Sequence, residues 1–391
     1  VDRGNAEDSC WLSDLRAYHH GQSDPLDLIL RRSAAMLNDI AKLPKAPKLD
    51  AMKTKLAGLK ASADKVDPKD AAARRAIFDK VCILRRKIAF SNPLLDFNEL
   101  LVLKRKMPGY NHMCDQYYGL AQTPGGGLYV LSDPFGSKPK IRSLLDKSVV
   151  ETGRLKGTKL SGGPNKTWKV RYNGNGGASG DKTEGGSFLS PDLSFDGKTV
   201  AFAYVELTGE QTHDFHVDPK RGHWTKGRSY HVFTVGADGK NLRMLTDGTW
   251  NDFDPCFMPS GRIAFITERR GGYLRCGRVC PTYTLYDMNA DGSQIKCLSF
   301  HETNEWQPSV NNDGMIVWTR WDYVDRHGVT AHMAWTTTPD GRDPRAVHGN
   351  YSVRRERPDM EVDVRAIPGS HKWDLLPHKE NFGTASILSR E

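Results

Sequence analysis

Apolar residues in the first quarter of the chain recur at the spacing of a helix. They fall three or four residues apart after a polar cap and Pro25, again over residues 49–64, and again after Pro68. A stripe with this period places its apolar side chains on one face of an α-helix, where they can pack against a neighbour. The pattern predicts a short α-helical hairpin over residues 23–91, preceded by an irregular lead-in over residues 1–22.

Near residue 92 the period changes from helical to alternating. Three segments then align with one another, and each has a proline, a glycine-containing turn and an alternating apolar strand; they begin at Ser190, Asp254 and Gln307. A second hairpin recurs between them, with turns at Gly239, Gly292 and Gly341. A repeat of two hairpins is one four-stranded blade. The sequence therefore predicts an all-β propeller over residues 92–391.

The number of repeats predicts an incomplete ring. A partial blade precedes the three repeats at residues 125–145, and another begins at residues 357–373. This makes four blades and the start of a fifth, fewer than we expect of a closed ring of this type. The chain stops where a further strand should begin, so we expect a truncated C-terminus.

Blade topology sorts the loops between the two ends of the propeller. The short glycine turns lie at one end, and the loops that join the second strand to the third and one blade to the next lie at the other. The second set contains "HDFHVDPKRGHW", "DGTWNDFD", "ERRGGYLRCGRVCP", "HETNEW" and "RWDYVDRH". Long loops on one end of a rigid scaffold usually carry function, so we expect the chemistry at this loop-rich end.

Thiols and imidazoles in this part of the chain are candidate metal ligands. Cys276 and Cys280, with three residues between them, can bind a metal ion with Cys256 or His301, because thiolate and imidazole are zinc donors. Cys114, in "YNHMCDQYYG", belongs either to a ligand group or to a buried hinge where helices meet propeller. A disulfide or buried thiols explain the Cys276 and Cys280 pair equally well.

One loop carries three histidines within eleven residues, His213, His216 and His223. They are a weaker metal candidate, since a long polar loop can simply be solvated.

Two further loops carry candidate catalytic groups. His301 with Glu302, and also Glu305, can supply a general base or hard ligands for a divalent cation. The next loop, "RWDYVDRH", contains arginine and acidic residues, and its arginines can bind an anionic ligand. The candidate catalytic set is His301, Glu302, Arg320, Asp322 and His327. The structural alternatives are a blade-joining turn around Trp306 and arginine–aspartate contacts between blades.

Composition narrows the class of protein. Hydrophobic residues make up 38% of the chain and charged residues 26%, and no apolar run is long enough to span a membrane. The net charge is +9, of which +7 falls in residues 1–106, yet the aromatic platforms and dense basic clusters of nucleic-acid binders are absent from the sequence.

Seven cysteines leave at least one unpaired. The chain begins with Val1, so we expect that an export signal has been removed.

Several longer phrases are more specific than generic repeats. "YNHMCDQYYG", "GGGLYVLSDPF", "SPDLSFDGKTVAFAY", "TDGTWNDFDPCFMPSGRIAFITERR" and "FHETNEWQPSVNNDGMIVWTRWDYVDRH" resemble the propeller (middle) domain of the hydrazine synthase alpha-subunit family, over roughly residues 85–371. The repeats are similar to the TolB/PD40 type. The resemblance implies an exported protein, periplasmic or secreted, from planctomycete-like bacteria.

The family's enzymatic member uses c-type haems and a zinc site, and haem attachment needs two cysteines followed by a histidine. Cys276 and Cys280 are separated by three residues and are followed by Pro281, so no covalent haem is expected. Zinc or another divalent metal remains the expected cofactor.

Three functions follow as hypotheses. The first is a ligand- or metal-binding module at the loop-rich end, serving an unknown ligand or partner protein. The second is a polysaccharide lyase that acts on uronate polymers, with His301 or His327 as base and Arg320 neutralising charge. The third is a non-catalytic interaction scaffold that docks through its basic helical hairpin. We expect neither nucleic-acid binding nor a membrane span.

Overall fold

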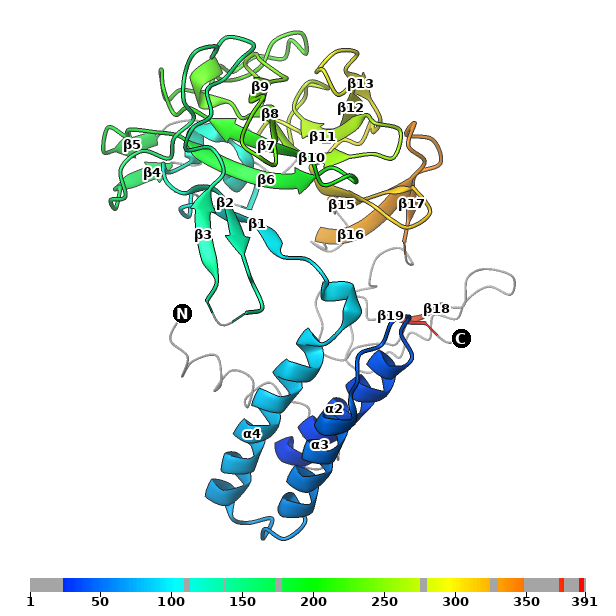
Figure 1. Cartoon of the computed structure of the whole chain (residues 1–391). Helices are drawn as coiled ribbons and strands as arrows, with labels where there is room; N and C mark the ends of the chain where they lie inside the picture. The colour runs from blue at the N-terminus through cyan, green and yellow to red at the C-terminus, as the bar shows by residue number, and fades with distance from the viewer. Residues whose placement is uncertain are drawn as a thin grey trace. The chain divides into compact units, whose positions relative to one another are not determined.

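The computed structural model describes residues 24–108, 113–136, 138–172, 178–274, 280–323, 330–347, 373–375 and 387–389. The lead-in over residues 1–22 and nearly all of residues 357–373 lie outside these ranges. The chain divides into two compact units (Figure 1). The helical unit comprises residues 1–100 and 132–139, and the sheet unit comprises residues 101–131 and 140–391.

The described part of the helical unit contains three helices, α2 (Pro25–Ala41), α3 (Asp50–Ala63) and α4 (Ala71–Phe90). The side chain of Asp24 caps α2 by accepting a hydrogen bond from a backbone N–H of its first turn. Asp70 caps α4 in the same way. Such caps satisfy donors that have no partner within the helix.

The apolar stripes of the three helices form one core. The sequence predicted a helical hairpin, and the structure has a three-helix arrangement in which α2 and α3 each pack chiefly on α4. The most deeply buried core residues are Leu26, Ile29, Leu37, Phe78, Val81, Leu84 and Ile88. A short 3₁₀ helix, η2 (Pro93–Leu95), follows α4.

The remaining structure consists mostly of antiparallel sheets. A three-stranded sheet has the order β1 (Glu99–Lys104), β2 (Gly127–Ser132), β3 (Lys140–Ser143), and the boundary between the two units passes through it. Two small hairpins pair β4 (Val170–Tyr172) with β5 (Ala178–Gly180) and β18 (Trp373–Leu375) with β19 (Ile387–Ser389).

Three four-stranded sheets follow the chain order strand by strand, as the repeats predicted. The first is β6 (Ser187–Leu193), β7 (Thr199–Val205), β8 (His231–Gly236) and β9 (Arg243–Met244). The second is β10 (Asp252–Phe257), β11 (Ile263–Thr267), β12 (Thr284–Met288) and β13 (Lys296–Cys297). The third is β14 (Glu305–Val310), β15 (Ile316–Tyr323), β16 (Thr330–Thr337) and β17 (Arg345–Ala346).

Consecutive sheets pack against one another through their first strands. β10 packs against both β6 and β14. The turn glycines inferred from the repeats have left-handed backbones in every sheet, for example Gly261 with φ 81° and Gly292 with φ 87°. A left-handed turn costs glycine little because it has no Cβ. The turns therefore fix the register that aligns the buried faces.

A segment of two short 3₁₀ helices, η3 (Met113–Tyr117) and η4 (Gly119–Ala121), runs into the core that the three sheets share. A further one, η5 (Lys226–Arg228), precedes β8. Among the described residues, no helix has the length and apolar character needed to cross a bilayer.

Candidate functional site

We call residues 113–122 the central segment, because its side chains are buried among the three four-stranded sheets. The Tyr117 ring stacks on Phe253 of β10, with centroids 4.9 Å apart. The Tyr118 ring is fully buried, and its hydroxyl donates to the carbonyl oxygen of Pro281 over 2.7 Å. These contacts join the segment to β10 and to the loop before β12.

Gly119 lets the central segment approach the sheets closely. Its N–H donates to Asn251 Oδ1 over 2.9 Å. A Cβ at this position would lie 2.3 Å from the carbonyl oxygen of Arg228. Only glycine fits such an approach between two stretches of backbone.

Two thiols meet beside the central segment. Cys114 and Cys280 are 0% and 1% exposed, although they lie far apart in the sequence. Asn304 Nδ2 donates to Cys114 Sγ over 3.2 Å. Burial, and then the neighbouring Cys280, raise the pKa of the Cys114 thiol well above its ordinary value. The motif "YNHMCDQYYG" thus supplies a buried thiol to the core of the sheet unit, and its assignment to a ligand group stays a prediction.

The other predicted thiol ligands are Cys256 and Cys276. Cys256 is on β10, where its Sγ donates to the carbonyl of Phe257 over 3.6 Å, and burial raises the pKa of its thiol to about 12. Cys276 lies outside the described residues. Within the described ranges, no group of three or more His, Cys, Asp or Glu side chains is arranged to hold a metal ion. The described residues thus bring Cys114 and Cys280 together without completing a ligand set.

His301 was predicted both as a metal ligand and as a catalytic base. Its Nε2 lies 2.8 Å from the carbonyl oxygen of Trp321. A carbonyl only accepts, so Nε2 carries the proton and a base role would fall to Nδ1.

The remaining predicted catalytic residues are spread over a loop and a strand. Glu302 is exposed in the loop before β14. Arg320 and Asp322 are on strand β15 rather than in a loop, and the Arg320 guanidinium lies 4.0 Å from the centroid of the Trp335 ring. His327 lies outside the described residues.

Four buried carboxyl groups differ from what the sequence predicted, because three were expected in loops and one was overlooked. Asp252, Asp254 and Glu305 were expected in loops, but they lie on the first strands β10 and β14 and are at most 3% exposed. Glu268, which follows β11, was not singled out. Burial raises the pKa of each carboxyl. The signal that could have found them is an acidic residue inside an otherwise apolar strand.

Asp254 connects three sheets. Its carboxylate accepts hydrogen bonds from the Ser190 hydroxyl of β6 and, over 2.8 Å, from the backbone N–H of Gln307 on β14. All three residues stand at equivalent bulges before a proline, with φ of 47° for Ser190, 49° for Asp254 and 51° for Gln307. The repeat therefore places one left-handed residue on the first strand of each sheet.

Glu268 is fully buried beneath the long loop between β7 and β8. Its carboxylate accepts from Trp224 Nε1 over 3.0 Å, and from both the backbone N–H and Nδ2 of Asn251 over 2.8 and 3.0 Å. Burial raises its pKa from the ordinary 4.5 to about 7, against the opposing effect of these donors. The carboxylate links the loop to the first strand of the second sheet.

The three histidines of the long loop gather around Tyr273. The rings of His216 and His223 stack at 4.5 Å, and His213 packs on the Trp224 ring at 4.6 Å. His216 Nε2 donates to the carbonyl of Gly222, which leaves its lone pair on the buried Nδ1. Within the described residues, neither ring nitrogen of His213 has a hydrogen-bond partner, and the residue is 8% exposed.

Burial keeps two of the three imidazoles neutral. It lowers the pKa of His213 and of His223 from 6.5 to about 4. The sequence-based prediction of a histidine cluster is thus correct in placement, but the rings stack rather than converge on one point.

Comparisons with solved structures give distant similarities. One is to hydrazine synthase from Kuenenia stuttgartiensis, with 14% identity over 65% of this chain and 32% of that chain and a TM-score of 0.40. Another is to oligogalacturonate lyase from Vibrio parahaemolyticus, with 11% identity over 64% of this chain and 72% of that chain and a TM-score of 0.30. A third is to TolB from Acinetobacter baumannii, with 10% identity over 72% of this chain and 60% of that chain and a TM-score of 0.27.

The matched part of this chain spans about a third of the hydrazine synthase chain. No protein-family model matches the sequence, and no curated protein matches it. These similarities assign no activity to the chain.

Proposed function

We propose that the three four-stranded sheets are consecutive blades of a β-propeller and that this unit is a metal-binding module, with a ligand site at its loop-rich end. The meander order of each sheet and the packing of first strand against first strand support the propeller arrangement. The metal ion is zinc or another thiophilic divalent ion, held by Cys114 and Cys280.

The meeting of these two buried thiols carries the proposal. Thiolate is a preferred zinc donor, and a hydrogen bond from Asn304 to Cys114 Sγ is the kind of contact that orients a metal-bound thiolate. Cys276, four residues before Cys280, is the third ligand that the sequence predicts. When bound, the ion would ionise the thiols and tie the central segment to the loop before β12.

The ligand site of this proposal is the histidine loop. His213, His216 and His223 offer imidazoles at the loop-rich end, and Phe215 and Val217 of the same loop expose 52% and 89% of their surface. Apolar surface beside hydrogen-bonding groups is typical of a recognition loop. The partner or ligand itself is not identified by these contacts.

We propose further that the chain is a haem-free relative of the hydrazine synthase alpha-subunit family and is periplasmic or secreted. The phrases quoted above support this, together with the missing attachment motif. Cell fractionation of the native organism tests the location, and recovery in the cytoplasmic fraction would contradict it.

Metal analysis of the purified full-length chain tests the central proposal. We expect about one zinc ion per chain by plasma mass spectrometry, and its loss in both Cys114→Ser and Cys280→Ser. The matched controls are Cys82→Ser and Cys256→Ser, which remove thiols outside the pair and should keep the metal. Affinity should fall as the pH falls, because protons compete for the thiolates.

Two outcomes would overturn the metal site. One is a chain free of metal whose stability is unchanged by a chelator. The other is a Cys114–Cys280 disulfide in freshly purified protein, detected by counting free thiols before and after reduction.

A further inference from the structure

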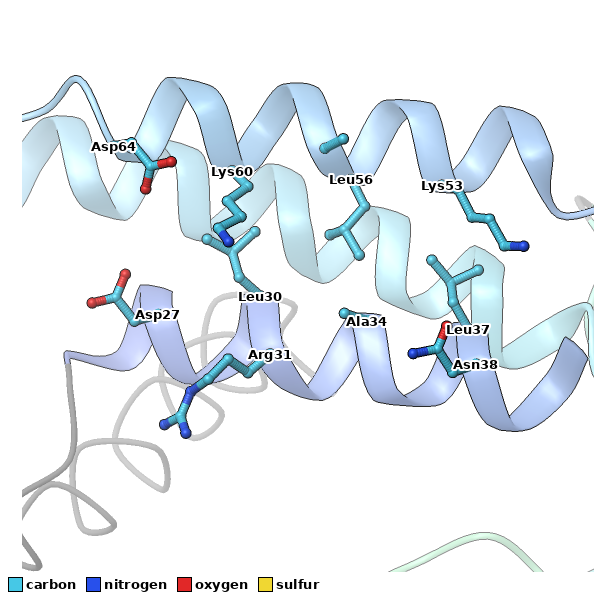
Figure 2. A pocket seen from close by; sticks show the side chains of 11 residues that line it. Asp27, Leu30, Arg31, Ala34, Leu37, Asn38, Lys53, Leu56, Lys60 and Asp64 are labelled. Carbon is cyan, nitrogen blue, oxygen red and sulfur yellow. The ribbon is translucent and has the colours of Figure 1, made fainter.

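The helical unit has an open groove between α2 and α3 (Figure 2). Each of these helices packs chiefly on α4 rather than on the other, and a cavity of about 450 Å³ remains between them. The residues that line it fall within residues 27–38 and 53–64. Twelve residues of helix rise by roughly 17 Å, so the groove is about three turns long.

Side-chain size explains why the groove is hollow. Its deepest lining residues are three leucines that are at most 7% exposed, Leu30, Leu37 and Leu56. Each helix also contributes an exposed alanine to the lining, Ala34 on α2 and Ala57 on α3. These short side chains leave space that longer ones would fill. The groove can therefore accept the apolar stripe of another helix.

Positive charge follows the α3 edge of the groove. Lys53 and Lys60 are exposed there, and neither forms an ion pair among the described residues. They lie seven residues apart, which is two turns and roughly 10 Å along the helix. The unit as a whole is basic, with 16 lysines and arginines against 8 acidic residues in residues 24–91. Acidic groups about 10 Å apart would complement this edge.

One end of the groove has the opposite charge. Asp27, in the first turn of α2, and Asp64, the C-cap of α3, both line this end (Figure 2). Asp27 contacts Arg74, whereas Asp64 forms no ion pair among the described residues. A helix N-terminus carries partial positive charge and is stabilised by nearby carboxylates. This end therefore favours the N-terminus of an occupying helix, which would run parallel to α2.

We propose that the groove binds an acidic amphipathic helix of a partner protein, about three turns long. The apolar stripe of that helix packs on Leu30, Leu37 and Leu56. Two of its acidic side chains, seven residues apart, lie beside Lys53 and Lys60. The bound helix is the fourth member of a bundle whose other three helices come from this chain.

The two lysines separate this occupant from the alternatives. A fatty acid also has an apolar part, but its single acidic group matches only one lysine. A second copy of this chain would have to offer one of its own helices. None of the described helices α2, α3 and α4 contains two acidic residues seven apart, so none of them matches Lys53 and Lys60 together.

Titration of the full-length chain with synthetic peptides tests the proposal. The probe is a helix of about 14 residues with leucines at heptad spacing and two glutamates seven residues apart beside them. A second peptide has lysines in place of the two glutamates. Fluorescence anisotropy should show saturable one-to-one binding of the glutamate peptide, with a Kd no weaker than about 100 µM. The lysine peptide should bind at least about tenfold more weakly.

Filling the groove should block the binding. Ala34→Leu with Ala57→Leu should weaken it at least about tenfold, because leucine occupies the space that the partner helix needs. Leucine is close to alanine in helix propensity, so both helices should persist. The matched control is Ala35→Leu with Ala51→Leu, which makes the same change at exposed positions of α2 and α3 outside the groove and should leave the affinity unchanged.

Reversing the charges tests the acidic character of the partner. Lys53→Glu with Lys60→Glu should weaken binding of the glutamate peptide about threefold to tenfold and strengthen binding of the lysine peptide. The matched control is Lys55→Glu with Lys65→Glu, which makes the same charge change at exposed positions outside the groove and should have a smaller effect.

Each of four results would overturn the proposal. The first is the absence of saturable binding of the glutamate peptide, and the second is an equal effect of the groove variants and their controls. The third is binding of laurate that the filling variant abolishes and charge reversal leaves unchanged, which would assign the groove to an acyl chain. The fourth is self-association in sedimentation that the filling variant abolishes, which would assign the groove to a second copy. Unchanged hydrogen exchange in α4 shows that each variant is folded.

Discussion

The two units of this chain are held together in different ways. In the described part of the helical unit, the buried polar or charged residues are Ser33 and Arg74, and the rest of the core is apolar. The described part of the sheet unit buries six carboxylates, three histidines and an arginine in addition to its aromatic core. Three of those carboxylates, Asp252, Asp254 and Glu305, lie on first strands, where consecutive sheets meet.

The difference follows from geometry. A helix satisfies its own backbone, so helices can meet through side chains of leucine and isoleucine alone. Where the first strands bulge, the ladder is interrupted and freed N–H groups need acceptors. Asp254, which accepts from Gln307 N–H, supplies one. We expect the sheet unit to depend on single polar groups and the helical unit to depend on few, and tryptophan fluorescence can follow the sheet unit because every described tryptophan lies in it.

The largest effect should come from Asp254→Ala. It leaves the Ser190 hydroxyl and the Gln307 N–H without their acceptor, and alanine is poorly suited to a φ of 49°. We expect the free energy of unfolding to drop by about 3–5 kcal/mol in a urea titration. Asp254→Asn, which tolerates the left-handed backbone and keeps one acceptor, should cost about half as much. Equal costs for the two variants would contradict this account.

Acid should destabilise the sheet unit before the helical unit. His213, His223 and His231 have folded pKa values of about 4 against an ordinary 6.5, in each case because of burial. Between these values the unfolded chain binds protons that the fold does not, so the free energy of unfolding falls as the pH falls from about 6.5 to about 4. Fluorescence-monitored unfolding at several pH values should show this slope, and His231→Gln should reduce it. A flat profile would refute it.

Glu268→Gln should have an effect that depends on pH in the opposite sense. The folded pKa of Glu268, about 7, exceeds its ordinary 4.5, so its contribution to stability is present below pH 4.5 and lost as the pH rises through 7. Glutamine does not titrate, and its side-chain NH₂ would face the N–H groups of Trp224 and Asn251. This should lower the free energy of unfolding by about 1–3 kcal/mol. The cost, measured at pH 5 and pH 8, should be smaller at pH 8. A larger cost at pH 8 would show that the carboxylate is stabilised by its donors more than burial opposes it.

In the helical unit, Asp24→Ala should cost about 1–2 kcal/mol. The variant removes the cap of α2 and the ion pair with Arg74, which is 6% exposed. Asp70→Ala removes a cap that has no such pair and is the matched control, with an expected cost near 1 kcal/mol. Hydrogen exchange in α2 and α4 measures both. A cost for Asp24→Ala as large as that of Asp254→Ala would erase the contrast between the units.

The smallest effect should come from Arg342→Ala. Its contact with Asp340 lies on the exposed turn between β16 and β17, where solvent screens the pair. We expect no measurable change in the urea midpoint. A clear loss of stability would mean that exposed pairs, too, hold the sheet unit together.

Much of the fold could be predicted from local patterns. The stripes that begin near Pro25 and after Pro68 gave the helices, and the recurring turns at Gly261 and Gly292 gave the four-stranded sheets. These signals extend over a few residues, so the chain displays them directly. The candidate site was accessible in part: the histidine loop was named, while Asp254 was expected in a loop and Glu268 was not singled out.

Residue types and spacings by themselves determined which side chains could do chemistry and how each strand and helix would be patterned. The tertiary structure alone decided which of them meet. Asp254 reaches Ser190 because consecutive sheets pack through their first strands. Cys114 neighbours Cys280 because the central segment is buried in the core that the sheets share. Periodicity has a range of a few residues, whereas contact between sheets depends on how whole sheets pack. For this reason the sequence could indicate cysteines as candidate ligands, whereas only the tertiary structure shows that Cys114 and Cys280 are neighbours.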